Sequence, residues 1–122
     1  MEKREDDCAA AFLRYARYGF DRRNLSIFDM ADCIRGCVAD AGEAKVMMAV
    51  YDTIRLLAFM GRREELLAVK AVYFGRHGRR LRRNDVSLRV RRFAVENYCD
   101  DRTVYRRLAK AKRLLLDLLA ES

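Results

Sequence analysis

Basic side chains recur along residues 101–118 at a spacing that would set them on one side of a single helix. They are Arg102, Arg106, Lys110 and Arg113, with Tyr105 at the edge of that side. The opposite side carries an apolar stripe at helical period, formed by Val104, Leu108, Ala111, Leu115 and Leu118. A guanidinium can pair with a guanine edge through two hydrogen bonds or hold a phosphate, so this pattern is typical of a helix that contacts DNA.

A second helix is predicted just before this one. Asn84 is a good N-cap, and the stripe that follows consists of Val86, Val90, Phe93 and Ala94. Arg89 and Arg92 point away from that stripe. Asp100 or Asp101 is expected to cap the helix that carries the basic row, so the two helices are separated by only a short turn.

Residues 84–119 resemble the helix-turn-helix of sigma factor region 4 and of small phage transcription activators and response-regulator output domains. The resemblance rests on the run Asp100-Asp101-Arg102-Thr103-Val104-Tyr105-Arg106-Arg107-Leu108 and on Ala94, ten residues before Val104. Asp100 takes the capping position of the pattern and Leu108 its branched apolar position. Tyr98 stands where the turn usually has glycine and Asn97 where it usually has an apolar residue, so we expect a longer or differently shaped turn.

The resemblance implies a DNA-binding transcription regulator of bacterial or phage type whose sixth helix enters the major groove of double-stranded DNA. We expect Arg102 and Arg106 to read bases, and Thr103 and Tyr105 to contact phosphate, sugar or a thymine methyl. Phosphate contacts are expected from Lys110, Arg113, Arg89 and Arg92. The alternative function is a protein-interaction adaptor whose basic helices bind an acidic surface, such as one on RNA polymerase.

The charge of the chain is unevenly placed, which favours a polyanion-binding module. Residues 1–61 hold 9 Lys/Arg and 10 Asp/Glu, whereas residues 62–122 hold 17 Lys/Arg and 8 Asp/Glu. The near-neutral half is therefore joined to a strongly basic half, a distribution typical of phosphate binding. The plainer interpretation is a solvated arginine-rich face.

The fold class predicted from composition is all-α with about six helices. The 122 residues contain no proline, only 6 glycines and many helix-favouring residues. Helical periodicity predicts helices over 5–18, 27–40 and 43–60, a fourth beginning at Glu64, and the two described above. We expect Gly42 to break the second helix.

Three parts of the chain are expected. Residues 1–74 would form a helical bundle, 75–83 a basic linker, and 84–122 the helix-turn-helix module. The linker holds two glycines and five arginines, and it is either a solvated connector or a basic arm that lies on the phosphate backbone.

No enzyme, metal site or cofactor is expected. The only histidine, His77, lies in the arginine-rich linker, and the chain shows no nucleophile–base pair and no glycine-rich phosphate loop. The four cysteines are Cys8, Cys33, Cys37 and Cys99. Cys33 and Cys37 are four residues apart, a spacing that a zinc site could use, but a strong metal signal needs a closer pair or a histidine partner. We therefore expect reduced core cysteines and a cytoplasmic protein.

The most apolar run, Val46 to Met60, contains Asp52 and Arg55. It is too short and too charged to span a bilayer. Its apolar residues surround much of the predicted helix, which predicts either a homodimer with this helix at the interface or a helix wrapped by the rest of the chain.

Overall fold

The computed structural model describes residues 3–74 and 85–121, and all regular secondary structure within these ranges is helical. The elements are α1 (Lys3–Arg17), the short 3-10 helix η1 (Phe20–Arg22), α2 (Ile27–Cys37), α3 (Ala41–Phe59), α4 (Arg63–Val72), α5 (Asp85–Glu96) and α6 (Asp101–Ala120). The expected all-α class with about six helices is confirmed.

Local signals in the sequence set most of the helix boundaries. The Ser26 hydroxyl accepts a hydrogen bond from the Asp29 backbone N–H at the start of α2. Gly19, after α1, and Gly61, after α3, take the left-handed conformation that ends a helix, with φ of 84° and 72°. The predicted stop at Gly42 is wrong: α2 already ends at Cys37, and Gly42 lies in the first turn of α3. Asp40 caps α3 instead, because its carboxylate accepts a hydrogen bond from Glu43 N.

One apolar core runs through the molecule, and α6 crosses most of it. The inward stripe of α1 is fully buried, as its periodicity predicts, and consists of Cys8, Phe12, Tyr15 and Ala16. Val104, Leu108, Ala111 and Leu115 of α6 are completely inaccessible. The buried residues of all six helices belong to this single core, so α6 is held by the N-terminal helices as well as by α5.

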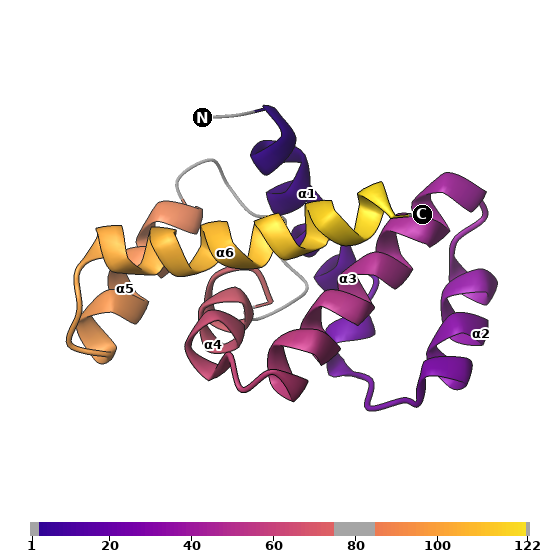
Figure 1. Cartoon of the computed structure of the whole chain (residues 1–122), viewed down its shortest axis with the longest axis horizontal. Coiled ribbons are helices and arrows are strands. Elements are labelled where there is room, and N and C mark those ends of the chain that lie inside the picture. Colours follow the sequence, from indigo (N-terminus) through magenta and orange to yellow (C-terminus); the bar gives the residue numbers. More distant parts are fainter. Residues whose placement is uncertain (1–2, 75–84, 122) are drawn as a thin grey trace.

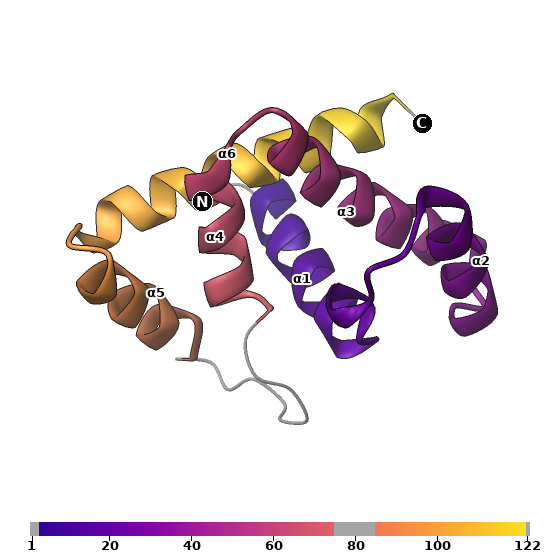
Figure 2. The same cartoon turned by 90° about the horizontal axis from the view of Figure 1, so that it is seen from below.

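Figure 1 shows α6 along the length of the molecule, with α5 near its beginning and α2 at the opposite end. In the turned view of Figure 2 the same order holds, with α4 and α1 between these two ends. α6 packs against α1, α3, α4 and α5, and α4 also packs against α5. Helices α4, α5 and α6 thus contact one another in all three pairings. The division into residues 1–74 and 84–122 stays a prediction, while the core itself is continuous across it.

α3 is wrapped on several sides by the same chain. It packs against α1, α2, α4 and α6, and the residues that it buries are Met47, Ala49, Val50, Tyr51, Thr53 and Leu57. Its C-terminal end is different, because Phe59 is 89% exposed and Met60 51% exposed. The apolar character of the helix is therefore explained mostly by intrachain burial, with an uncovered patch where α3 ends.

Two apolar residues that share the helical spacing of the buried residues of α2 lie on the surface instead. Ile27 and Cys37 are exposed, whereas Met30, Ile34 and Val38 are buried. Both exposed residues are terminal residues of this short helix. Of the four cysteines predicted to lie in the core only Cys8 is buried, whereas Cys33 and Cys99 are half-buried and Cys37 is exposed; all four are free thiols. Among the described residues no helix is long and apolar enough to cross a membrane.

Candidate nucleic-acid interface

The N-terminal half of α6 is fixed by contacts with both α4 and α5. Val90, Phe93 and Ala94 of α5 are buried together with Val104 and Leu108 of α6. Arg107 extends the bracing to α4, with its Nη2 atom 2.7 Å from Glu64 Oε2. Packed apolar residues hold the inner side of α6 in place, and the Arg107–Glu64 ion pair holds its flank. The side chains on the outer side of α6 are therefore carried by a rigid helix.

The turn between α5 and α6 is a helix C-cap in which tyrosine replaces the usual glycine. Cys99 N donates to Ala94 O at 3.0 Å and Tyr98 N donates to Val95 O at 3.3 Å. These two bonds define the Schellman motif, whose residue after the cap is left-handed. Tyr98 has that conformation, with φ of 55°. The turn is therefore a standard, compact one, and the prediction of a longer or differently shaped turn is wrong. Tyr98 adopts the left-handed conformation that is typical of glycine, and Asn97 does not.

Asp100 begins α6 and holds its first turn. Its Oδ1 atom accepts a hydrogen bond from the Thr103 backbone N–H at 2.8 Å. Hydrogen bonds from the Thr103 side chain and backbone, and then the positive charges of Arg102 and Arg106, lower the pKa of the Asp100 carboxyl. The Thr103 side chain is half-buried, which limits the part of it that can meet a ligand.

The predicted basic row is present on the outer side of α6. Arg102, Arg106, Lys110 and Arg113 are all exposed, and Tyr105 beside them is 43% exposed. Their spacing of four, four and three residues sets them along one side of the helix. In the part of the chain that the structure describes, none of these four side chains forms a salt bridge. Four exposed cations in one row, none of them in a salt bridge with another described residue, favour an anionic partner from outside the chain.

The two basic residues predicted on α5 differ in their surroundings. Arg92 is exposed, as a phosphate contact requires. Arg89 is half-buried, and its Nη1 atom donates to the backbone carbonyl of Val72 in α4 at 2.9 Å. Arg89 therefore has a structural partner within the chain, and only its remaining N–H groups are left for any other contact.

Two basic residues of α6 have positions that helical periodicity did not reveal. Arg107 pairs with Glu64 of α4, and Lys112 is buried with its ammonium 5.8 Å from the centre of the Tyr73 ring. Both lie between the apolar stripe and the basic row. The sequence did offer a signal for Lys112, since it directly follows Ala111 of the apolar stripe. A lysine at such a position buries its aliphatic stem at the edge of the core.

Nothing among the described residues gathers three potential metal ligands in one place. The predicted basic linker, residues 75–83, and the predicted N-cap Asn84 lie outside the described residues. No protein family, curated protein or solved structure matches the chain.

Proposed function

We propose that this protein binds double-stranded DNA through the outer side of α6 and regulates transcription in the manner of bacterial or phage regulators. The observation that carries the proposal is the row of Arg102, Arg106, Lys110 and Arg113, which are exposed and form no salt bridge with the described residues, on a helix held by α4 and α5. An α-helix with its side chains fits the major groove of B-DNA. The excess of positive charge in residues 62–122 adds long-range attraction to a polyanion.

Within this proposal the side chains near the start of α6 read bases. Arg102 and Arg106 are nearest the capped end, which in helix-turn-helix proteins is the end that contacts base edges. Lys110 and Arg113 lie further along the same row and hold phosphates, together with Arg92 of α5. Such contacts position the protein without specifying sequence. Tyr105 contacts sugar or a thymine methyl from the edge of the row.

Selection of bound duplexes from a random library, followed by footprinting, tests the proposal. We expect an enriched sequence and a protected stretch on it. Arg106→Ala should then reduce discrimination between the enriched and a random duplex by about 1–3 kcal/mol, as loss of a base contact does. Arg92→Ala is the matched comparison and should weaken binding to both duplexes about equally.

The proposal fails if no sequence is enriched and the protein does not bind random duplex at low salt. If Arg106→Ala and Arg92→Ala lower the affinity for both duplexes by the same factor, DNA binding stands but the assignment of base-reading and phosphate-holding residues is wrong.

An adaptor function is the second candidate, and the outer side of α5 favours it. Leu88 and Val95, seven residues apart, are 63% and 70% exposed on that side, next to the exposed Arg91 and Arg92. An apolar pair rimmed by cations suits an acidic protein surface such as one on RNA polymerase. Leu88→Ser/Val95→Ser should abolish binding to RNA polymerase without changing DNA affinity. If the polymerase binds the wild type and this variant equally, or binds neither, the second candidate is excluded.

A further inference from the structure

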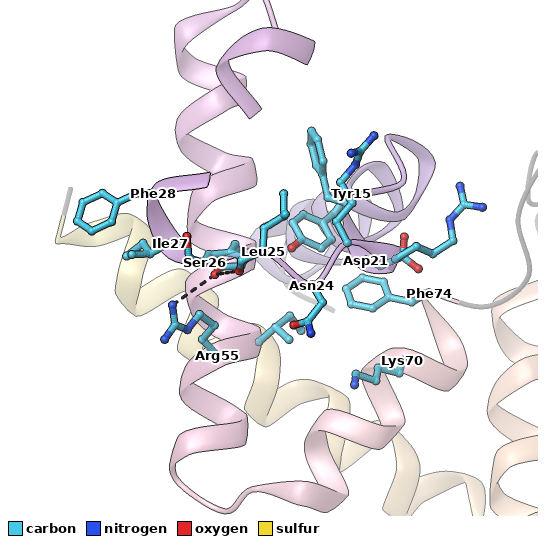
Figure 3. Close-up of a pocket in the computed structure, with 15 residues that line it drawn as sticks. Tyr15, Asp21, Asn24, Leu25, Ser26, Ile27, Phe28, Arg55, Lys70 and Phe74 are labelled. Carbon is cyan, nitrogen blue, oxygen red and sulfur yellow. Dashed lines mark hydrogen bonds between the residues drawn. The ribbon is translucent and has the colours of Figure 1, made fainter. Parts of the chain in front are cut away.

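An open cavity is lined by residues outside α6. It lies between the segment that joins η1 to α2, the middle of α3 and the end of α4. Its volume is about 950 Å³, which is in the range of small-molecule sites. Figure 3 shows residues from these three places and from α1 around it, with Tyr15 of α1 and Phe74 on one side and Arg55 on the other. None of the basic side chains proposed to contact DNA lines it.

One wall of the cavity is a fixed aromatic surface. The Phe74 ring centre is 5.5 Å from that of Tyr15 and 6.2 Å from that of Phe12. Tyr15 in turn packs edge-on against Phe20, at 5.6 Å. Because Phe12, Tyr15, Phe20 and Phe74 are all buried, this wall is held by the core and offers an apolar face without rearrangement.

The charged side chains of the lining are mostly cationic. Among the described residues that line the cavity are Arg22, Arg23, Arg55 and Lys70, against the single carboxylate of Asp21. Figure 3 shows Arg55 and Lys70, from α3 and α4, on either side of Asn24 in that view. These cations come from three separate elements and converge on one space, unlike charges scattered over a solvated helix surface.

Arg55 is held in place at this cavity. Its Nη1 atom donates to the Tyr51 hydroxyl at 3.3 Å, and the guanidinium carbon lies 5.7 Å from the centre of the same ring. The Tyr51 hydroxyl donates to Leu25 O at 2.7 Å, which ties the segment before α2 to α3. A cation oriented in this way loses less conformational entropy when it binds an anion.

We propose that this cavity binds a small organic anion, namely a carboxylate, sulfonate or phosphate carried on an aromatic body. The ring of the ligand packs against Phe74 and Tyr15, and its anionic group lies between Arg55 and Lys70. Asn24 and Ser26 line the same space and supply polar groups that orient the ligand. This site does not depend on the α6 surface, so it stands or falls apart from DNA binding.

Isothermal titration calorimetry with 1-naphthyl phosphate tests the site, with 1-naphthol and inorganic phosphate as the separate halves of the probe. We expect saturable binding of one 1-naphthyl phosphate per chain, and binding at least about tenfold weaker for either half alone. Arg55→Gln and Lys70→Gln should each weaken the binding of 1-naphthyl phosphate about tenfold, because each removes a charge-assisted contact.

Lys45→Gln is the matched control, since it removes one exposed charge from the same helix as Arg55 and Lys45 does not line this cavity. It should leave the affinity unchanged, and a thermal unfolding scan should show that all three variants are folded. The proposal is overturned if 1-naphthyl phosphate does not bind. It is equally overturned if Arg55→Gln and Lys70→Gln both bind as tightly as the wild type, or if Lys45→Gln weakens binding as much as they do.

Discussion

The guanidinium of Arg89 on α5 donates a hydrogen bond to the backbone carbonyl of Val72, the last residue of α4, over a distance of 2.9 Å. A carbonyl in the last turn of a helix has no partner within that helix. Arg89 satisfies it and at the same time fixes the beginning of α5 against the end of α4. The contact joins two residues 17 positions apart in the sequence.

Removal of the Arg89 side chain should therefore destabilise the fold. We expect Arg89→Ala to lower the free energy of unfolding by about 1.5–3 kcal/mol, the range for a hydrogen bond that involves a charged group. Arg92→Ala, at an exposed position of the same helix, should change it by less than about 0.5 kcal/mol. Urea unfolding measures both, and equal small effects would mean that the Arg89–Val72 bond contributes nothing to stability.

The left-handed turn at Tyr98 should be improved by glycine. Tyr98 has φ of 55° and a side chain that is 98% exposed, so its conformation is strained while its ring makes little contact. Relief of about 1–2 kcal/mol of backbone strain exceeds the about 0.4–1 kcal/mol that glycine costs through the unfolded chain. Tyr98→Gly should stabilise the protein by about 0.5–1 kcal/mol in urea unfolding.

Tyr98→Ala is the control for this substitution. It removes the same ring but keeps the Cβ atom that causes the strain, so its stability should stay close to that of the wild type. If alanine and glycine stabilise the protein equally, the exposed ring and not the backbone is the source of the penalty.

The Asp52 carboxylate should destabilise the fold at neutral pH, compared with an uncharged side chain at the same position. Burial raises the pKa of its carboxyl above the ordinary 3.8, although the positive charge of Arg55 opposes the shift. Because the pKa is raised on folding, the ionised form disfavours the folded state above that pKa, and the penalty disappears as the pH falls through it.

Asp52→Asn should accordingly raise the free energy of unfolding at about pH 7, and the advantage over the wild type should shrink toward about pH 4. Urea unfolding at several pH values measures the difference. A variant that is less stable than the wild type at neutral pH would show that the Asp52 carboxylate is a net stabilising group.

A homodimer through the end of α3 stays a prediction, now restricted to a smaller patch. Phe59, the last residue of α3, and Met60, its C-cap, are exposed among the described residues. Sedimentation equilibrium at micromolar concentration should give about twice the chain mass of 14.3 kDa, and Phe59→Ser/Met60→Ser should give the single-chain mass. A wild-type mass of one chain would exclude the dimer.

The basic row, the buried stripes and most helix boundaries could be predicted because they depend on local properties. Helical period alone separates Val104 and Leu108 from Arg102 and Arg106, and a capping side chain such as Ser26 acts over three residues. The prediction places the start of α3 too late because Gly42 indicates a helix break. In the structure the capping signal of Asp40, two residues earlier, is stronger and begins the helix before Gly42.

Contacts between distant segments could not be predicted in this way. No periodicity links Arg107 to Glu64 or Arg89 to Val72, since these pairs depend on how α4 lies against α5 and α6. The aromatic wall and cations of the cavity are drawn from four separate stretches of the chain. The left-handed Tyr98 was visible as an unusual residue in the turn, but only the backbone shows that the turn keeps the conformation typical of glycine.

The central claim is that the outer side of α6, and not the net charge of the chain, binds DNA. Fluorescence anisotropy with a labelled random duplex between about 50 and 200 mM salt tests it most directly, because non-specific affinity falls with salt according to the number of phosphates contacted. The comparison is between Arg102→Gln/Arg106→Gln and Arg17→Gln/Lys45→Gln. Both double variants remove two exposed positive charges.

We predict that Arg102→Gln/Arg106→Gln weakens binding by about tenfold or more at the lower salt concentration and reduces the slope of log Kd against log salt by about 2. Arg17→Gln/Lys45→Gln should change the affinity by less than about twofold and leave the slope as it is. Equal losses in the two double variants, or no binding of the wild type to duplex DNA at the lower salt concentration, would contradict the account.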